Sequence, residues 1–495
     1  MPFFSAVQRV VLIAIGVALV GCNDDGTPPP TGRLNFPTAI AVTGESLFVA
    51  NSNFTLRFNS GSLHRYDLGA LNMRLRAQCG DRPAAERDTC GIIPSEDPQS
   101  EDLEDTLDVS VESGVLTSEV FIGSFASGIA VAETPSGGER VYLSVRSDAD
   151  LTFVDVNDAG GMNCGADGGF ESSLVGDPRR HRCANANRES DQSLAEAQDI
   201  TLPSDPVALA TGPLEELGGP AGFGQYVVTA HRGGRMSLFV VEANGGLLGT
   251  PFLVNVLEGL PRELVTVSLE PSFDGLPRRL WVPNALAPEI SRVGVALDAS
   301  PRDVTRSYLY DAGAAFLAGV DTGGAGVGDT RALRFDPREG VRRAYVLSRR
   351  PRALLSVDLS EDNAILEVRD IMEVGIGPSR LEVRRFEDSD RTLAFVSCFD
   401  TRDVYVLDVD QGRLVGIVRG LGGAFELAFS EASDNPDEDA NLLYVVDFQA
   451  SIVRVLDLEP MFECLDNVSE FDPDRECSPE PLGFLGRPNT RRELI

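Results

Sequence analysis

The chain contains no lysine, only three histidines and a single tryptophan, so all 43 of its basic residues are arginine. Three histidines leave little material for a His-rich metal site or for acid–base machinery that needs several imidazoles. Basic residues are also outnumbered by 76 acidic ones, and the formal net charge is −33. Such a chain repels phosphate backbones, so we expect no nucleic acid partner. The base composition of the gene and a demand for guanidinium groups would each explain the missing lysine.

Sequence signatures of catalysis are missing as well. The chain has no Gly-x-Ser-x-Gly or His-Glu-x-x-His motif, no phosphate-binding loop and no dinucleotide-binding glycine motif between a strand and a helix. Acidic stretches occur at 96–108, 155–158 and 433–439, but none has the spacing of an EF-hand, and solvated loops carry such residues too. We therefore identify no catalytic residue and expect no metal and no cofactor, with calcium in these loops as the open alternative.

Hydrophobic runs of the roughly 20 residues that cross a membrane are also absent. The run at 10–20 is shorter, follows Arg9 and suits the apolar core of a secretory signal. We therefore predict a signal peptide over 1–21, and with it an exported protein.

The residues that follow this run point to a lipid anchor. The small Gly21 before Cys22 resembles the lipobox of bacterial lipoproteins. The resemblance implies that Cys22 is lipidated, becomes the first mature residue and tethers the protein to a membrane through a flexible segment over 22–33. Asn23 lacks the carboxylate that retains such proteins at the inner membrane in enteric-type systems, which favours the bacterial outer membrane.

Most of the eight cysteines lie in short polar loops. Besides the lipidation site, six cysteines pair by proximity: Cys79 with Cys90, Cys164 with Cys183, and Cys464 with Cys477. Such pairs form disulfides in an oxidising compartment; zinc is the alternative, but no Cys-x-x-Cys or Cys/His spacing supports it. Cys398 remains inside the apolar run 393–399, where a buried free thiol is favoured over a reactive one.

Between residues 34 and 488 one pattern recurs seven times: three short runs of β-branched and aromatic residues, with a weaker fourth run leading into the next copy. The first runs lie at 37–42, 128–131, 206–210, 264–269, 332–335, 378–383 and 425–429. Four strands per unit at a basic period of about 45 residues is typical of propeller blades. We predict an all-β chain that forms a seven-bladed β-propeller of four-stranded antiparallel blades over 34–488, followed by a C-terminal tail over 489–495.

The repeat resembles that of the YVTN and lactonase-like propellers, in which a Pro-x-x-(Ile/Leu)-Ala-Val run precedes a (Leu/Val)-(Tyr/Phe)-Val-(Ala/Ser)-Asn run and a Val-rich strand that ends in Asp. The stretches 37–42 and 47–51 carry this pattern in the first copy. Repeated Trp-Asp pairs, Kelch double glycines and Asp-boxes are absent, and the lone Trp281 disfavours the quinoprotein type. The resemblance implies a fold and not a reaction, because the acid and Arg/His set of its enzymatic members cannot be matched to positions of this chain.

The propeller frame assigns the loops to two faces. Loops between the second and third strands carry more basic than acidic residues, and a basic mouth at the ring axis would bind an anion or an acidic segment; solvated loop charges are the alternative. The candidate ligand-binding residues are His231, Arg232, Arg235, Arg349, Arg350 and Arg352. The three disulfide loops fall between the third and fourth strands of blades 7, 1 and 2. They should therefore cluster on the opposite face, as an interaction platform or as simple staples.

These observations favour a non-catalytic, lipid-anchored module of the bacterial envelope that binds or scaffolds a protein, a glycan or a small anionic ligand. A lactonase-like hydrolase acting on a small anionic substrate is the alternative, and it would need His231 as its proton-transfer group. An accessory subunit of an outer-membrane assembly is a third candidate, by analogy alone.

Overall fold

The computed structural model describes most of the chain between residues 27 and 489. The described residues are 27, 29–94, 108–111, 114–157, 160–164, 183, 187–189, 200, 202–219, 222, 224–244, 247–273, 278–286, 289–297, 307–318, 328–360, 365–387, 389–430, 441–467 and 475–489. Among them, no helix has both the length and the hydropathy needed to span a bilayer. The predicted signal peptide, the lipidation site Cys22 and the tail after 489 lie outside these residues, as do most of the acidic stretches at 96–108 and 433–439.

The described strands form units of four antiparallel strands, each built from one continuous stretch of chain. The first unit contains β1 (Pro37–Thr43), β2 (Ser46–Asn51), β3 (Gly61–Asp67) and β6 (Leu116–Ile122). The second contains β7 (Ala126–Glu133), β8 (Glu139–Val145), β9 (Asp150–Val156) and β10 (Met162–Asn163), with β11 (Arg188–Glu189) beside β9. The third contains β12 (Pro206–Pro213), β13 (Gly224–His231), β14 (Arg235–Asn244) and β16 (Phe252–Leu257), with β15 (Leu247–Leu248) beside β14.

Four more units follow among the described residues. The fourth contains β17 (Ser268–Leu269), β18 (Arg279–Val282), β19 (Glu289–Ala296) and β20 (Tyr308–Ala318), and the fifth contains β21 (Gly328–Phe335), β22 (Arg343–Arg350), β23 (Arg352–Leu359) and β24 (Ile365–Glu373). The sixth contains β25 (Pro378–Phe386), β26 (Arg391–Cys398), β27 (Asp403–Asp408) and β28 (Arg413–Val418). The seventh contains β29 (Ala424–Phe429), β30 (Leu442–Asp447), β31 (Ile452–Asp457) and β32 (Glu480–Leu485). A parallel pairing of β20 with β24 joins the fourth unit to the fifth.

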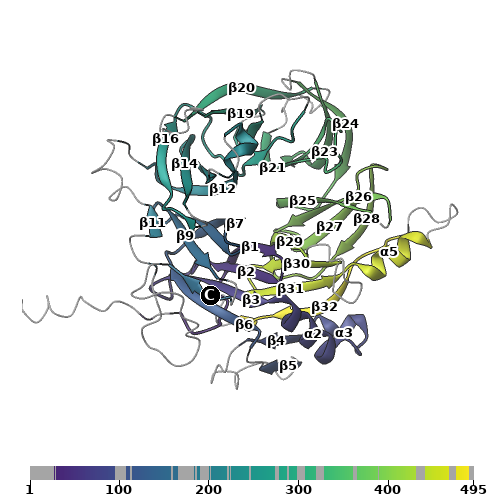
Figure 1. Cartoon of the computed structure of the whole chain (residues 1–495). Coiled ribbons are helices and arrows are strands. Elements are labelled where there is room, and N and C mark those ends of the chain that lie inside the picture. The colour runs from purple at the N-terminus through teal and green to yellow at the C-terminus, as the bar shows by residue number, and fades with distance from the viewer. Residues whose placement is uncertain are drawn as a thin grey trace, which may run out of the picture.

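Figure 1 shows these units arranged in a ring around a central axis, with the first strands β1, β7, β12, β21, β25 and β29 nearest to it. The chain is a β-propeller, and the predicted fold class of four-stranded antiparallel sheets is confirmed. We number the units as blades 1 to 7 in chain order.

The second strand of each blade holds the core together. Each carries one large aromatic side chain with no exposed surface: Phe48, Tyr142, Tyr226, Trp281, Tyr345, Phe395 and Tyr444. These strands lie between two hydrogen-bonded neighbours and between two packed blades, so both of their faces are buried, as β2 illustrates with six buried residues out of six. A fully buried aromatic ring contributes about 1.5–3 kcal/mol through the water it excludes. The hydrophobic runs that recur in the sequence therefore supply the side chains that pack neighbouring blades together.

The ring closes without exchanging a strand between blade 1 and blade 7. The backbone N–H of Phe36 donates to the Ser451 hydroxyl (3.1 Å) across this junction. In addition, the insertion between β3 and β6 contains α2 (Leu68–Cys79), α3 (Ala84–Arg87), β4 (Cys90–Ile93) and β5 (Asp108–Val111). Within it, β4 pairs in parallel with β32, the outermost strand of blade 7. The insertion of the first blade thus extends the sheet of the last one.

The structure contains all three disulfides that the sequence predicts: Cys79–Cys90 and Cys464–Cys477 lie between the third and fourth strands of blades 1 and 7, and Cys164–Cys183 lies between β10 and β11, which both pair with β9 of blade 2. Each of these loops lies against the outermost strand of the preceding blade. The backbone N–H of Cys183 donates to Phe121 O of β6 (2.9 Å), and that of Cys477 donates to Val415 O of β28 (2.8 Å), beside α5 (Glu459–Asp466). The three loops therefore cover the three neighbouring blade edges β6, β28 and β32. The remaining thiol, Cys398, is free and buried, as predicted, and burial raises its pKa to about 12.

Candidate functional site

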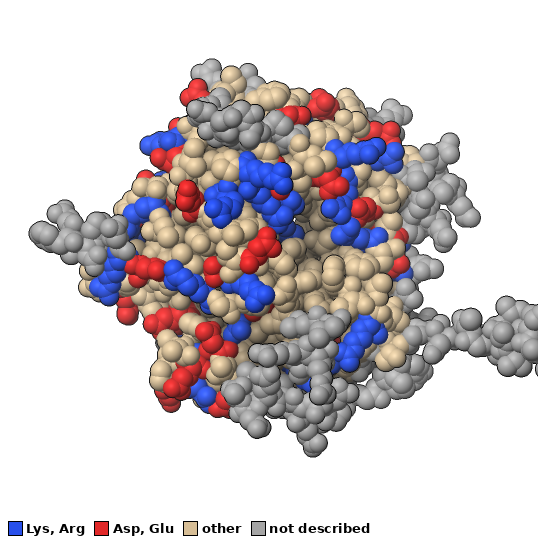
Figure 2. Space-filling view, turned by 180° about the vertical axis from the view of Figure 1, so that it is seen from behind, with Lys and Arg blue, Asp and Glu red and all other residues tan. Residues whose placement is uncertain are grey.

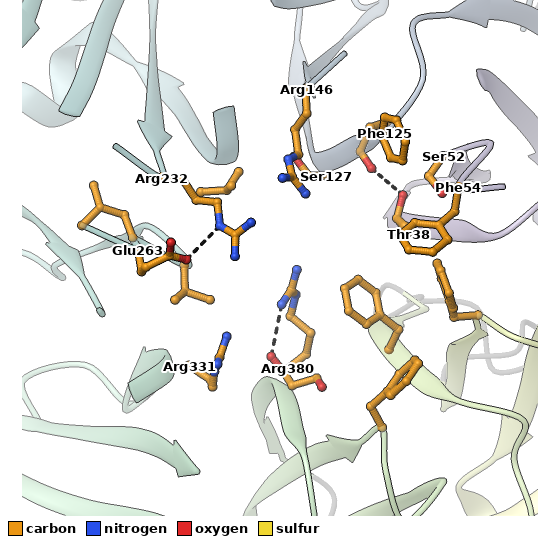
Figure 3. Close-up of a pocket in the computed structure, with 18 of the residues that line it drawn as sticks. Thr38, Ser52, Phe54, Phe125, Ser127, Arg146, Arg232, Glu263, Arg331 and Arg380 are labelled. Atoms are coloured by element: carbon orange, nitrogen blue, oxygen red, sulfur yellow. Dashed lines mark hydrogen bonds and ion pairs between the residues drawn. The ribbon is translucent and has the colours of Figure 1, made fainter. Parts of the chain in front are cut away.

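The ring axis holds a cavity of about 400 Å³ on the face where the loops between the second and third strands lie. In Figure 3, Arg232, Arg331 and Arg380 reach into this cavity from one side, while Phe54 and Phe125 lie on the other. The space-filling view shows basic side chains gathered around a hollow in the middle of the molecule (Figure 2). The mouth of the ring is therefore divided into a charged half and an aromatic half.

Two backbone positions build the rim of this mouth in six of the seven described blades. We call the residue directly before the inner strand the lead residue, and its carbonyl accepts the N–H of the residue that follows the second strand. In blade 4, where β17 begins at Ser268 and β18 ends at Val282, Glu263 and Ala285 take these two places. The pairs, lead residue first, are Phe36 with Ser52, Phe125 with Arg146, Asp205 with Arg232, Glu263 with Ala285, Gly377 with Phe399, and Gly423 with Phe448, at 2.9–3.2 Å. In blades 1 to 4 the lead residue has a left-handed backbone with φ between 52° and 62°, although none of the four is glycine. Such conformations cost free energy and gather at functional sites.

The charged half, which we call the arginine arc, consists of Arg146, Arg232, Arg331, Arg349 and Arg380. Carboxylates hold four of them. The guanidinium of Arg146 binds Asp205 and that of Arg232 binds Glu263 (2.9 Å), so an arginine of one blade is held by the lead residue of the next. Arg331 pairs with Asp329, and Arg380 pairs with Glu426 (2.8 Å). These pairs fix the direction of each side chain without filling the cavity.

Arg349 differs from the other members of the arc. Its Nε donates to Pro378 O (2.9 Å) and its Nη2 to the Ser379 hydroxyl (3.4 Å), both of which are neutral acceptors. Among the described residues, no carboxylate lies within 4.0 Å of its guanidinium. Burial lowers the pKa of Arg349, and the nearby charges of Arg331 and Arg380 lower it further, while Asp329 and Asp400 act in the opposite direction without contacting the guanidinium. Arg349 is therefore the member of the arc whose direct partners in the described structure are all neutral.

The aromatic half, which we call the phenylalanine wall, consists of Phe54, Phe125, Phe399, Phe425 and Phe448. Phe448 is its centre: its ring centroid lies 5.5 Å from Phe54, 5.9 Å from Phe399 and 6.0 Å from Phe425. Phe54 closes the wall toward Phe125 (6.0 Å) and is 56% exposed. The guanidinium of Arg380 stacks on Phe425 at 4.7 Å and joins the wall to the arc. A protein keeps so many exposed aromatic edges together mainly where it binds something.

Two of the six predicted ligand-binding residues, Arg232 and Arg349, line the cavity. His231 does not: it is the last residue of β13 rather than a loop residue and is 1% exposed. Its Nε2 contacts the Ser237 hydroxyl (2.9 Å) and burial lowers its pKa to about 4. Arg235 pairs with Glu258 outside the cavity (3.1 Å). Arg350 and Arg352 flank the turn between β22 and β23 and are also outside the lining.

A second, smaller cavity of about 160 Å³ lies deeper in the channel. Its charged lining consists of two ion pairs, Arg334 with Glu382 (2.6 Å) and Arg380 with Glu426 (2.8 Å). Burial raises the pKa of Glu426 in spite of the pairing. Because Arg380 lines both cavities, this charged floor fixes one member of the arc. No group of three or more potential metal ligands occurs in the described part of the chain.

Sequence analysis missed two kinds of lining residue. Arg331 and Arg380 lie on inner strands, whereas the search for basic residues covered only loops. The phenylalanines are spread over four blades and stand singly in the sequence. A signal was present: Phe399 and Phe448 each follow the second strand of a blade, at the position that Arg146 and Arg232 occupy in other blades. Aligning the seven copies on that position would have brought the two chemistries together.

Comparisons with known proteins found neither a matching family model nor a matching curated protein. Several solved structures are similar to this chain. A candidate 6-phosphogluconolactonase from Bacteroides fragilis has 12% identity and a TM-score of 0.47, with 92% of this chain and 99% of that chain covered. Hydrazine synthase from Kuenenia stuttgartiensis has 12% identity and a TM-score of 0.47, over 86% and 96%. The β-propeller domain of Cps50 (Swd1) from Myceliophthora thermophila has 10% identity and a TM-score of 0.44, over 86% and 98%. At these identities the likeness concerns the fold alone.

Proposed function

We propose that this protein is a binding module whose axial mouth takes a small ligand with an anionic group. The observation that carries the proposal is Arg349, a half-buried guanidinium with neutral acceptors, set between Arg331 and Arg380. An anion bound there would satisfy the remaining donors of Arg349 and relieve the repulsion among the three cations. The other arginines already have carboxylate partners, so one negative charge completes the arc.

The test is titration of the mature protein with acetate, benzoate and inorganic phosphate, followed by calorimetry. Arg349→Ala should weaken binding of the preferred anion by about 10- to 100-fold, the range expected for a hydrogen bond to a charged group. Arg350→Ala is the matched control, because Arg350 is adjacent, exposed and outside the lining, and it should leave the affinity unchanged. Equal affinities in both variants would contradict the proposal. Measurable turnover of lactones by the same preparation would favour the hydrolase instead.

We further propose that the module acts in the bacterial envelope, held to the outer membrane by lipid on Cys22. The proposal is supported by the run at 10–20, by Gly21 before the cysteine, and by disulfides that suit an exported protein. Cys22→Ser should abolish incorporation of labelled fatty acid and leave the precursor uncleaved or release it from the membrane. Recovery of the unaltered protein in the soluble periplasmic fraction would contradict the anchor.

A further inference from the structure

The phenylalanine wall faces the arginine arc across one cavity, and this juxtaposition restricts the ligand further than its charge does. We infer that the mouth takes an amphipathic monoanion: a carboxylate carried on an apolar, ring-sized body, with the carboxylate on Arg349 and the body against Phe448 and Phe54. The inference rests on the proposed function and adds to it the chemical class of the ligand. Its three supports are the composition of the wall, the hydrogen bonds of the hydroxyl groups around it and the charge balance of the arc.

The wall offers contact area and no polar partner. Phe54, Phe399 and Phe425 surround Phe448 with centroid separations of 5.5–6.0 Å, so their rings form one continuous aromatic surface. Phe54 is 56% exposed and would lose water contact when an apolar body covers it. A cavity of about 400 Å³ is at the small end of the range for ligand pockets, which suits a body of one or two rings.

The hydroxyl groups of the lining argue against a sugar. Thr38 donates to Ala126 O (2.6 Å), Ser52 to Phe36 O (2.7 Å), Ser127 to Pro206 O (2.9 Å) and Ser379 to Gly377 O (2.9 Å). Each of these protons is thus committed to the backbone of the protein itself. A polyhydroxylated ligand would leave its own hydroxyl groups facing phenylalanine, and unpaired polar groups cost free energy on burial.

The charge balance of the arc argues for a single negative charge. Arg146, Arg232, Arg331 and Arg380 each have a carboxylate partner, whereas Arg349 has only neutral acceptors among the described residues. A dianion would bring one charge without a matching cation into a chain that is already strongly acidic. A carboxylate, which is planar and can bind a guanidinium edge, meets this requirement.

The experiment compares four probes on the full mature chain: 3-phenylpropionate, its neutral amide, acetate and gluconate. We expect 3-phenylpropionate to bind at least 10-fold more tightly than each of the other three. Phe54→Ala and Phe448→Ala should each weaken 3-phenylpropionate by about 5- to 10-fold and leave acetate unchanged. Phe316→Ala is the matched control, since Phe316 is also 56% exposed but belongs to β20 on the outer side of blade 4.

The outcomes separate this inference from the proposed function. If acetate or gluconate matches 3-phenylpropionate, and Arg349→Ala weakens all three equally, the mouth binds anions and the amphipathic class is wrong. If no probe responds to Arg349→Ala, the proposed function itself fails. Because Phe448 is the centre of the wall, its variant is checked by thermal unfolding. Phe54 is exposed, so its substitution by alanine should not disturb folding. If Phe54→Ala binds 3-phenylpropionate as tightly as the unaltered protein does, the inference is wrong.

Discussion

At the scale of single residues, the mouth shows how one backbone position serves different chemistries. The residue after the second strand is Arg146 in blade 2, Arg232 in blade 3, Phe399 in blade 6 and Phe448 in blade 7, and in all four its N–H is bound to the carbonyl of a lead residue. The backbone geometry is therefore constant while the side chain varies. Function in such a ring lies in the sequence at these positions rather than in the fold.

His231 illustrates the difference between a conspicuous residue and a functional one. It stands beside Arg232 in the sequence, but its ring is buried and held by Ser237 and by the carbonyl of Ser204. Burial lowers its pKa from 6.5 to about 4. The unfolded chain therefore binds a proton near pH 6.5 that the folded chain resists. The contribution of this residue to stability is complete above pH 6.5 and is lost as the pH falls toward 4.

We predict that His231→Gln, which can keep both hydrogen bonds, flattens the fall in unfolding free energy between pH 6.5 and 4. The change should amount to about 2–3 kcal/mol at the acidic end, because folding lowers the pKa of His231 from 6.5 to about 4. Chemical denaturation at pH 7, 5.5 and 4.5 measures it, and anion affinity at pH 7 should be unaltered. If this variant lost anion binding, His231 would have to be counted among the ligand-binding residues.

At the scale of elements, the sequence predicts the strands well and their edges poorly. The buried aromatic residue of every second strand belongs to a run that the repeats display, and alternation is a local property. The parallel pairing of β4 with β32 is not local, because it joins residues nearly 400 positions apart. The insertion that forms α2 is equally unpredictable, because its leucines Leu71 and Leu75 pack against Leu482 and Leu485 of blade 7. Disulfide spacing identified the loops but not the strands that they cover.

The same limit applies to the candidate site. Arg232 and Arg349 were found because the sequence predicts them in loops that a propeller places at its mouth, although Arg349 lies at the end of β22. Arg331 and Arg380 look like ordinary strand residues, and only the ring brings them to the cavity. The ion pairs with Asp329 and Glu426 that orient them follow from tertiary packing as well. Part of the charge was therefore readable from the sequence, whereas the phenylalanine wall opposite it was readable only for Phe399 and Phe448, and only after alignment of the copies.

At the scale of the whole molecule, the central question is how a ring without strand exchange stays closed. The described contacts across the junction of blades 1 and 7 include the Phe36–Ser451 hydrogen bond and the pairing of β4 with β32. Asn72 of α2 also accepts a hydrogen bond from the Tyr444 hydroxyl of blade 7 (3.1 Å). The Cys79–Cys90 disulfide joins the end of α2 to the start of β4. It therefore links α2 and β4, the two parts of the insertion that contact blade 7.

Removal of this disulfide should consequently loosen the ring and not only the loop. By the chain-entropy model, Cys79→Ala with Cys90→Ala costs about 2.5–3 kcal/mol, and Cys464→Ala with Cys477→Ala, which opens a loop of similar length, costs nearly the same. The two double variants should differ in where they loosen the molecule. Hydrogen exchange should rise in β32 for the first and in β28 for the second, because each loop covers the edge of the preceding blade. Faster exchange confined to α2 and β4, with β32 still protected, would mean that blade packing alone closes the ring.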